Sequence, residues 1–407
     1  MKHFIERFAE AAQNNWHKPA VCDYRGETFL YADVATHIAK LHIVFERLGV
    51  KVGDKIAISA NNTARWGISY LAIVSYRAVA VPILNGFTAE NLQKLVDHSD
   101  SVALFTERKM WANMSAEQMP QLKGAICIED FTELWSKDEI LKDVMPNLQQ
   151  LFRAKYPQGM KRKFVHYEVG EPDDLNTISY TSGTTADPKG ILLTHRNYTA
   201  NVEQGSSVIQ CKKHDVMLII LPLDHCFAHV AGFYTMMSYG GSIATVPVGK
   251  TAIATLKNIP IAIKEVKPML MLSVPTLARN FRKNIETSIK AKGKTVERLY
   301  EFALNNAIKY NKEYWNRGGW QAWRWPLVKL FDKLIFKAVR EGFGGRMRFF
   351  VGGGALLDIE LQRYFCAVGM PMFQGYGLSE ATPIICANSM GHAIFGSSGR
   401  IVSPLDL

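Results

Sequence analysis

The stretch KIAISANNTARWGISYLAIVSYRAVAVPIL, residues 55–84, decides the expected fold class. Its two ends, KIAISA (55–60) and AVAVPIL (78–84), are short apolar runs rich in β-branched residues, and such runs predict strands. The residues between them, 64–77, show a helical pattern. Repeated strand–helix–strand units of this kind predict parallel sheets that are covered by helices.

The same alternation continues along most of the chain, with a predicted helix at 89–99 and a predicted strand at 102–106. Further strand patterns occupy residues 176–181, 217–223, 242–248, 268–274 and 347–353. Two segments break the alternation. Residues 107–170 are polar and basic, and we expect a surface excursion between two halves of the sheet structure.

The second of these segments, residues 279–345, has a helical pattern and is rich in aromatic residues with basic residues between them. The residues concerned are Tyr300, Phe302, Lys309, Tyr310, Lys312, Tyr314, Trp315, Arg317, Trp320, Trp323, Arg324, Trp325 and Lys329. Such segments can lie on membranes or bind single-stranded nucleic acid. The sequence favours helices that pack their aromatic faces on the body, with peripheral membrane contact as the alternative.

Composition excludes several classes of protein. The 407 residues are 48% hydrophobic and 21% charged, as in folded globular proteins, and the net charge of +11 suits an anionic substrate or surface as well as a solvated exterior. The six cysteines form no CxxC pair, which argues against zinc or disulfide frameworks. The N-terminal segment lacks an apolar core of a signal peptide, and Asp224 interrupts the most apolar stretch. We therefore expect a cytoplasmic protein.

Residues 180–190, YTSGTTADPKG, follow a predicted strand and carry the strongest chemical signal in the chain. A loop of glycine, hydroxyl side chains and lysine offers N–H groups, hydroxyls and a cation to phosphate oxygens. It is not a Walker loop, because Lys189 precedes its glycine and no Ser or Thr follows the lysine. The predicted phosphate-binding residues are Thr181, Ser182, Gly183, Thr184, Thr185 and Lys189.

Three other segments complete a recognisable set: GGGAL (352–356), QGYGLSE (374–380) and LPLDHCFAH (221–229). Together with residues 180–190 they resemble the adenylate-forming superfamily, which includes acyl-CoA synthetases, luciferases and peptide-synthetase adenylation domains. GGGAL resembles the GGAPL segment of that family, with Leu356 in place of proline, and QGYGLSE resembles its YGxTE element, with Ser379 in place of threonine. LPLDHCFAH resembles the element that bears a histidine near the acyl pocket. His225 matches by position, His229 competes with it, and Asp224 departs from the usual pattern.

The resemblance implies a role for each matched residue. The Tyr376 ring is expected to stack on adenine, while the glycines let the backbone approach the nucleotide. Glu380 and the Thr181 hydroxyl are expected to hold Mg²⁺, which prefers few carboxylates together with phosphate oxygens and water. Lys189, Glu380 and His225 are the expected catalytic residues. The other nucleotide contacts are expected from the phosphate loop and from Gly353, Gly354, Ala355, Gln374, Gly375, Gly377 and Ser379.

Within the superfamily the chain most resembles long-chain fatty acid:CoA ligases, both in residues 331–357 and in the helical insert. This implies that ATP, Mg²⁺ and coenzyme A are used. The fatty acid would form acyl-AMP with release of pyrophosphate, and CoA would then displace AMP. A ligase that loads a carrier protein and a non-catalytic acyl- or nucleotide-binding protein are the alternatives. Nucleic acid is not an expected partner.

The resemblance also implies the domain organisation. Residues 1–407 are expected to form a large N-terminal domain with two mostly parallel β-sheets flanked by helices and a smaller distorted β-barrel. The expected subdomains are about 1–170 and 171–395, with the helical insert near 279–345. The ribose-binding acidic element and the lysine-bearing C-terminal lid of the family have no match in the sequence. We therefore expect a fragment that lacks the lid and is inactive, or nearly so, on its own.

Overall fold

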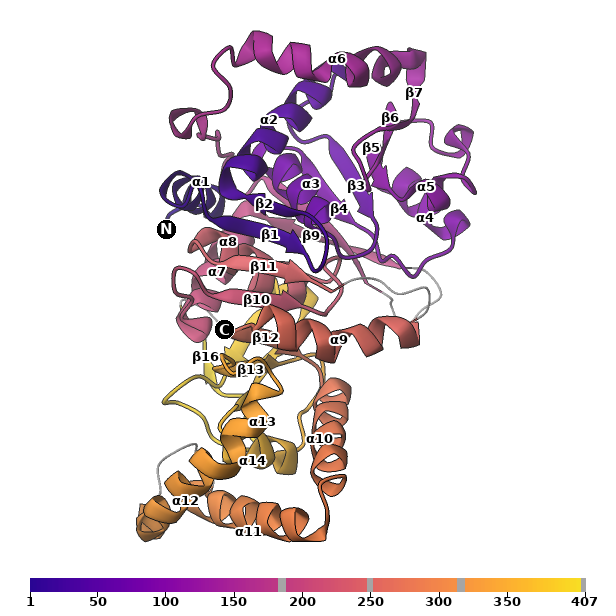
Figure 1. The fold of residues 1–407 in the computed structure, drawn as a ribbon. Helices are drawn as coiled ribbons and strands as arrows, with labels where there is room; N and C mark the ends of the chain where they lie inside the picture. Colours follow the sequence, from indigo (N-terminus) through magenta and orange to yellow (C-terminus); the bar gives the residue numbers. More distant parts are fainter. Residues whose placement is uncertain (182–187, 247–251, 313–318, 404–407) are drawn as a thin grey trace.

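The computed structural model describes residues 1–181, 188–246, 252–312 and 319–403, with only the backbone described at 252–256. Two β-sheets form the body of this part of the chain (Figure 1). The nine-stranded sheet has the order β16 (Arg400–Ile401), β15 (Ile384–Ala387), β14 (Met372–Gly377), β13 (Phe349–Gly352), β12 (Leu270–Ser273), β10 (Val216–Ile219), β11 (Ser242–Thr245), β1 (Pro19–Asp23) and β2 (Thr28–Leu30). The seven-stranded sheet has the order β7 (Glu133–Ser136), β6 (Gly124–Cys127), β5 (Ser101–Thr106), β3 (Lys55–Ser59), β4 (Val79–Pro82), β8 (Leu175–Thr181) and β9 (Lys189–Thr194).

Helices cover both sheets, as expected where parallel strands are joined by crossover connections. The α-helices of the described residues are α1 (Phe4–Asn14), α2 (Tyr31–Arg47), α3 (Ala64–Ser75), α4 (Ala89–His98), α5 (Arg108–Trp111), α6 (Ile140–Lys155), α7 (His195–Ile209), α8 (Thr235–Ser238), α9 (Ala252–Val266), α10 (Pro275–Lys290), α11 (Lys294–Asn311), α12 (Trp325–Phe331), α13 (Lys337–Glu341) and α14 (Ile359–Ala367). Shorter helical segments used below are η4 (Phe227–Tyr234), η5 (Gly319–Arg324), η6 (Asp332–Phe336) and η7 (Ser379–Ala381). No helix in the described ranges is both long and apolar enough to cross a lipid bilayer.

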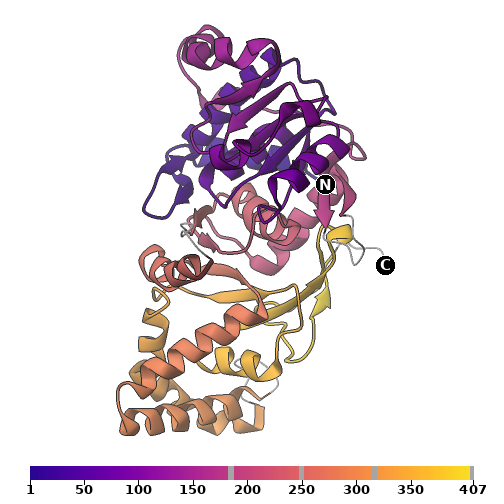
Figure 2. The ribbon, with the colours of Figure 1, turned by 90° about the vertical axis from the view of Figure 1, so that its right-hand side faces the viewer.

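The expected fold class is confirmed. β3 pairs in parallel with β4 and β5, and β10 pairs in parallel with β11 and β12. The smaller barrel is not confirmed, because β14, β15 and β16 pair antiparallel and form one edge of the nine-stranded sheet in the described part of the chain. The expected insert is helical, and its helices α10 to α13 form a lobe at the end of the molecule far from the seven-stranded sheet (Figures 1 and 2).

The strands of the two sheets do not divide near residue 170, where the sequence predicted a boundary between two subdomains. β1 and β2 come from the start of the chain, yet they complete the nine-stranded sheet, whereas β8 and β9 complete the seven-stranded sheet. The segment 107–170 is also more than a surface excursion, since its strand β6 pairs in parallel with β5. Each sheet therefore needs strands from both sides of the expected boundary.

A buried chain of hydrogen bonds joins the two sheets. The Tyr70 hydroxyl on α3 lies 2.7 Å from Thr177 Oγ1 on β8 and donates to the Tyr198 hydroxyl on α7 at 3.1 Å. The Tyr198 hydroxyl donates to His229 Nε2 at 2.8 Å, and His229 Nδ1 donates to the Leu223 carbonyl at 2.9 Å. Burial lowers the pKa of His229 to about 3, so the ring is neutral and can accept at Nε2 while it donates at Nδ1. This relay runs from a strand of the seven-stranded sheet to the loop after β10.

The loop at residues 221–225 is held from the seven-stranded sheet as well. The Asn62 amide donates to the Leu221 carbonyl at 2.8 Å and accepts from the Leu223 N–H at 2.8 Å. Asp224 Oδ2 accepts from the backbone N–H of Asn85 at 3.0 Å, while Oδ1 has no hydrogen-bond partner among the described residues. Burial raises the pKa of the Asp224 carboxyl to about 6, although the Asn85 N–H and the nearby His225 favour its charged form.

The raised pKa of Asp224 predicts a specific pH dependence of stability. In the unfolded chain this carboxyl ionises near pH 3.9. As pH rises from about 4 to 6, the unfolded state loses its proton first, so the free energy of unfolding falls, and the penalty is complete above pH 6. Asp224→Asn keeps an oxygen acceptor for Asn85 and removes the charge. We expect it to raise the free energy of unfolding at pH 7.5 by up to about 3 kcal/mol.

Urea unfolding of both proteins at pH 7.5 and pH 4.0 measures this effect. The difference between Asp224→Asn and the original protein is expected to shrink strongly at pH 4.0. Asp97→Asn, at an exposed position of α4, serves as a control that changes one carboxylate elsewhere. A difference of the same size at both pH values for Asp224→Asn would contradict the assignment.

Candidate functional site

A cavity of about 130 Å³ lies where α7, the loop before η4, the end of β13 and the β14–η7 segment meet. Segments that are far apart in the sequence supply its walls. The predicted site residues that line it are His225, Gly353, Gly354, Gly375, Tyr376, Gly377 and Ser379. Three of the motifs recognised in the sequence therefore share one cavity.

The glycines of this site are required by their surroundings. β13 and β14 run parallel with Gly352 opposite Gln374, so the loops that leave the two strands lie side by side. Gly354 has a φ of +79°, a backbone conformation that favours glycine. A Cβ atom at Gly377 would lie 1.7 Å from the Pro383 carbonyl oxygen. Any larger residue at Gly377 would therefore push apart the strands that form this wall.

Tyr376 and Gln374 have different positions, although both belong to the QGYGLSE motif. The Tyr376 side chain is 51% exposed and lines the cavity, so its ring face is available to a planar ligand. Gln374 is buried and does not line the cavity. Its Oε1 accepts from the Leu357 N–H at 2.7 Å, and its Nε2 donates to the Ala355 carbonyl at 3.3 Å. Gln374 thus holds the glycine-rich loop in place, and Ala355 lies on the exposed side of that loop.

The structure separates the two candidate histidines. His225 is exposed and lines the cavity. His229 is fully buried, and both of its ring nitrogens are used in the relay between Tyr198 and Leu223. Only His225 is available to a ligand, and His229 has a structural role.

β9, which follows the predicted phosphate loop in the sequence, packs against η7, the segment that contributes Ser379 to this cavity. Thr181 ends β8 and is paired with Lys189 at the start of β9, while Ser182, Gly183, Thr184 and Thr185 lie outside the described residues. Lys189 is exposed and Thr181 is half-buried. η7, which carries Glu380, packs against β9. The hairpin that bears the phosphate loop and the segment that bears Glu380 are therefore neighbours.

Glu380 and Thr181 fit a magnesium ion better than a metal that needs a cage of protein ligands. No group of three or more His, Cys, Asp or Glu residues that could hold a metal was found in the described ranges. One carboxylate and one hydroxyl leave most coordination positions to phosphate oxygens and water. That is the arrangement Mg²⁺ favours in nucleotide sites.

Sequence reasoning missed two residues that shape the site. The Asn201 amide on α7 donates to the carbonyls of Ala381 and Ile384 at 3.3 Å and 3.2 Å and accepts from the Ile384 N–H at 3.1 Å. It thereby fixes the segment that carries Glu380. Cys226 lines the cavity and its thiol lies 3.5 Å from Ser379 Oγ, but burial raises its pKa, so it stays protonated at neutral pH. No local motif marks either residue.

One wall of the cavity is apolar. Gly205, Val208 and Ile209 from α7 and Ala231 from η4 line it. The site therefore combines an exposed aromatic ring, flexible glycine backbone, one accessible histidine and an apolar wall, with a hydroxyl, a lysine and a carboxylate beside it. Such a set can bind and orient a phosphorylated substrate next to a hydrocarbon group. It offers no thiolate nucleophile from the cysteines that line it.

Comparison with known proteins agrees with this arrangement. The sequence matches the family described as AMP-binding enzyme over residues 8–407. One curated relative is the chloroplastic long-chain-fatty-acid–[acyl-carrier-protein] ligase AEE15 of Arabidopsis thaliana, 28% identical over 87% of this chain and 52% of that protein. Another is the long-chain-fatty-acid–CoA ligase FadD15 of Mycobacterium bovis, 26% identical over 91% of this chain and 59% of that protein. The chain thus spans little more than half the length of these relatives.

Solved structures share the fold. The N-terminal domain of FACL13 from Mycobacterium tuberculosis matches with a TM-score of 0.68 at 17% identity, and the match covers 99% of this chain and 83% of that one. The family match extends over almost the entire sequence and includes every motif that meets at the cavity. The chain belongs to the AMP-binding enzyme family.

Proposed function

We propose that this chain carries the acyl-adenylate-forming site of a long-chain fatty acid:CoA ligase. The observation that carries the proposal is the single cavity in which Tyr376, the glycines at 353–354 and His225 meet an apolar wall. The aromatic ring and glycines suit adenine, and the apolar wall suits a hydrocarbon chain. Both curated relatives are named as ligases of long-chain fatty acids, which supports the same substrate class.

The proposed reaction has two steps. The fatty-acid carboxylate oxygen attacks the α-phosphate of ATP, a P–O bond to pyrophosphate breaks, and acyl-AMP forms. The CoA thiol then attacks the acyl carbonyl, and AMP leaves. Phosphoryl transfer of this kind depends mainly on positioning and on charge stabilisation. A magnesium ion at Glu380 and Thr181 would supply charge neutralisation for the phosphate oxygens.

The residues of the candidate site have the following proposed roles in that reaction. Tyr376 and Gly353–Gly354 hold adenine, and the loop from Thr181 to Lys189 binds the phosphates through N–H groups, hydroxyls and the lysine. His225, which lines the same cavity, orients the acyl carboxylate. Gln374 and Asn201 hold the loops that carry these groups.

The acceptor of the acyl group and the location in the cell also belong to the proposal. One relative is named for transfer to an acyl-carrier protein and another for transfer to CoA, so a carrier protein is the alternative acceptor. Assays with CoA and with a phosphopantetheine-bearing carrier protein distinguish the two. A cytoplasmic location remains a prediction, since one relative is named as chloroplastic.

We also propose that the helical lobe contacts an anionic membrane surface. Sequence analysis favoured packing for its aromatic residues, and this is confirmed for Tyr300 and Tyr310, which are buried. It is wrong for Trp320, Trp323 and Trp325, which are 72%, 65% and 50% exposed. Tyr314, Trp315 and Arg317 lie outside the described residues.

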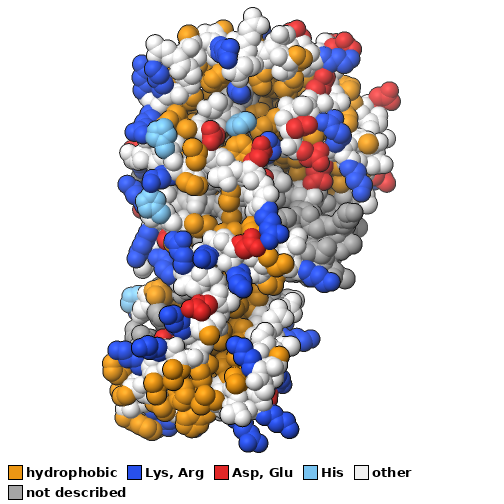
Figure 3. Space-filling view, viewed as in Figure 1, with side chains coloured by type: hydrophobic (Ala, Val, Ile, Leu, Met, Phe, Trp, Pro, Cys, Tyr) orange, Lys and Arg blue, Asp and Glu red, His pale blue; other side chains and the backbone are white. Residues whose placement is uncertain are grey.

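Each of these three tryptophans has a cation over its ring. Arg324 lies 4.2 Å from the ring centre of Trp323, Lys329 lies 4.7 Å from that of Trp325, and Lys312 lies 5.9 Å from that of Trp320. We name these six residues the aromatic–basic surface. Figure 3 shows hydrophobic side chains gathered over the outer end of the lobe with Lys and Arg around them. Amphipathic rings beside cations suit the headgroup region of anionic lipids.

Glu380→Gln tests the metal role of the carboxylate. In the full-length enzyme we expect acyl-adenylate formation, measured as palmitate-dependent ATP–pyrophosphate exchange, to fall by roughly 100-fold, because the lost charge acts when negative charge moves onto pyrophosphate. Binding of ATP, measured by calorimetry, should change little. Glu301→Gln, an exposed carboxylate on α11, is the matched control and should leave exchange unchanged. Full exchange activity in Glu380→Gln would remove this residue from the metal site.

The Trp320→Ala, Trp323→Ala double change tests the membrane surface. It removes two exposed rings, and we expect about a tenfold or greater loss of co-sedimentation with vesicles rich in phosphatidylglycerol. Binding of the original protein should also weaken as salt rises or as the anionic lipid is removed. Phe164→Ala, an exposed aromatic residue elsewhere, is the control. Equal binding for all three proteins, whatever the lipid charge, would show that the lobe does not dock on membranes.

A further inference from the structure

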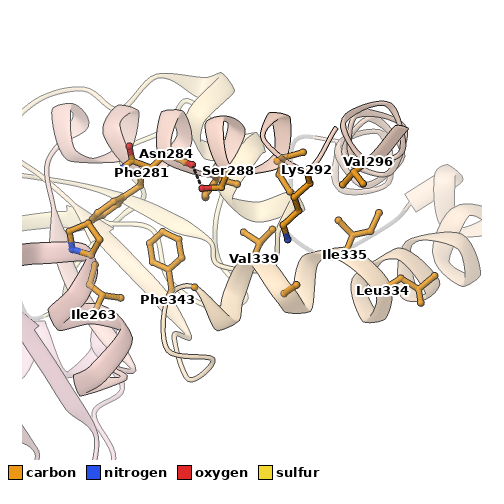
Figure 4. A pocket seen from close by; sticks show the side chains of 15 residues that line it. Ile263, Phe281, Asn284, Ser288, Lys292, Val296, Leu334, Ile335, Val339 and Phe343 are labelled. Carbon is orange, nitrogen blue, oxygen red and sulfur yellow. Dashed lines mark hydrogen bonds between the residues drawn. The ribbon is translucent and has the colours of Figure 1, made fainter. Parts of the chain in front are cut away.

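A second cavity, of about 330 Å³, lies inside the helical lobe and shares no lining residue with the candidate active site. It lies between α10 on one side and η6 and α13 on the other, with Pro260 and Ile263 of α9 at one end and the start of α11 at the other (Figure 4). Phe281 and Phe343 form its inner end, where their rings meet edge to face with centres 5.4 Å apart. Ile285, Ile289 and Val339, all buried, continue the apolar wall.

The lining of this cavity suits a hydrocarbon chain that has one negatively charged end. Among the described residues that line it, Lys292 is the one charged residue and none is a carboxylate. The other polar side chains are Asn284 and Ser288, and the Ser288 hydroxyl already donates to the Asn284 carbonyl at 2.8 Å. The cavity is therefore apolar along its length and cationic at one place.

The cation lies at the end of the apolar wall, just after α10. Phe281 and Ile285 are four residues apart on one face of α10, and Lys292 follows in the turn after the helix, which ends at Lys290. Figure 4 shows the Lys292 side chain descending from the end of α10 into the space above Val339. The structure shows no ion pair for the Lys292 amino group in the described part of the chain. A ligand with an anionic end could therefore meet this cation without displacing a protein carboxylate.

The opening of the cavity leads toward the aromatic–basic surface. Val296 and Leu334 line the cavity, and they are also 38% and 63% exposed at the outer part of the lobe. Leu334 belongs to η6, which directly continues α12, the helix that carries Trp325 and Lys329. An amphiphile that lies at this surface would thus reach the cavity mouth without crossing the body of the protein.

We propose that this lobe cavity binds one long-chain carboxylate, with its hydrocarbon chain along Phe281, Ile285 and Val339 and its carboxylate at Lys292. The size favours a single chain, and one cation matches one negative charge. This site is distinct from the candidate adenylate-forming site and does not depend on it. It would hold a fatty acid at the lobe before or apart from any reaction.

Binding of saturated carboxylates to the chain in the absence of nucleotide tests this proposal. A dodecanoate analogue with a diazirine near its methyl end is photolysed on the protein, and the labelled peptides are identified by mass spectrometry. We expect labels within 275–290 and 337–343, whatever is labelled at the adenylate-forming site. Absence of label from both segments would overturn the proposal.

Calorimetry and matched variants test the part of Lys292. Affinity should rise about fourfold per added methylene from octanoate to dodecanoate, since burial of each CH₂ follows the hydrophobic transfer scale. Lys292→Gln should weaken labelling of the lobe by dodecanoate about tenfold and leave labelling by the corresponding alcohol probe unchanged. Lys283→Gln, which changes an exposed lysine of α10 that does not line the cavity, is the control. Equal effects of both lysine changes would contradict the assigned carboxylate position.

A blocking variant completes the design. Ala338 is exposed and lines the cavity, so Ala338→Trp should fill the space without burying a polar group. It should abolish labelling of the lobe by both probes while binding of ATP, measured by calorimetry, is unchanged. If the lobe of Ala338→Trp were labelled as strongly as that of the original protein, the hydrocarbon chain would not occupy this cavity.

Discussion

The hydrogen-bonded relay Thr177–Tyr70–Tyr198–His229 is the interaction on which the arrangement of the site depends. It starts on β8, the strand that leads into the phosphate loop, and it ends at the carbonyl of Leu223, two residues before His225. Because its members are buried and neutral, removal of any one would leave polar atoms without partners in the interior. The relay thereby fixes the histidine loop of one sheet relative to the phosphate hairpin of the other.

The two faces of the nine-stranded sheet border different cavities. Successive side chains of a strand point to opposite faces, and on β13 this separates Phe350 from Val351. Val351 lines the candidate active site, whereas Phe350 packs on Phe281 and Phe343 at the inner end of the lobe cavity. A single strand thus supports the proposed adenylate site on one face and the proposed carboxylate site on the other.

Local pattern predicted the strands and the parallel class, because alternation is a property of short segments, and the resemblance to the adenylate-forming superfamily supplied the residues that meet at the cavity. It could not assign β1 and β2 to the nine-stranded sheet, since that pairing is decided by contacts with β11, more than 200 residues away. Asn62, Asn201 and Tyr198 were missed for the same reason. The choice between His225 and His229 and the exposure of Trp320 depend on burial, which the sequence pattern does not give.

The central claim is that one cavity holds both the adenylate and the start of the acyl chain. Calorimetric titration of this chain with non-hydrolysable acyl-sulfamoyl-adenosines of increasing acyl length tests it most directly, with Tyr376→Ala as the partner measurement. The account predicts that affinity rises with acyl length by up to about fourfold per methylene until the apolar wall is covered, and that Tyr376→Ala weakens binding at every length by a similar factor. Binding that ignores both acyl length and Tyr376, or no binding at all, would contradict it.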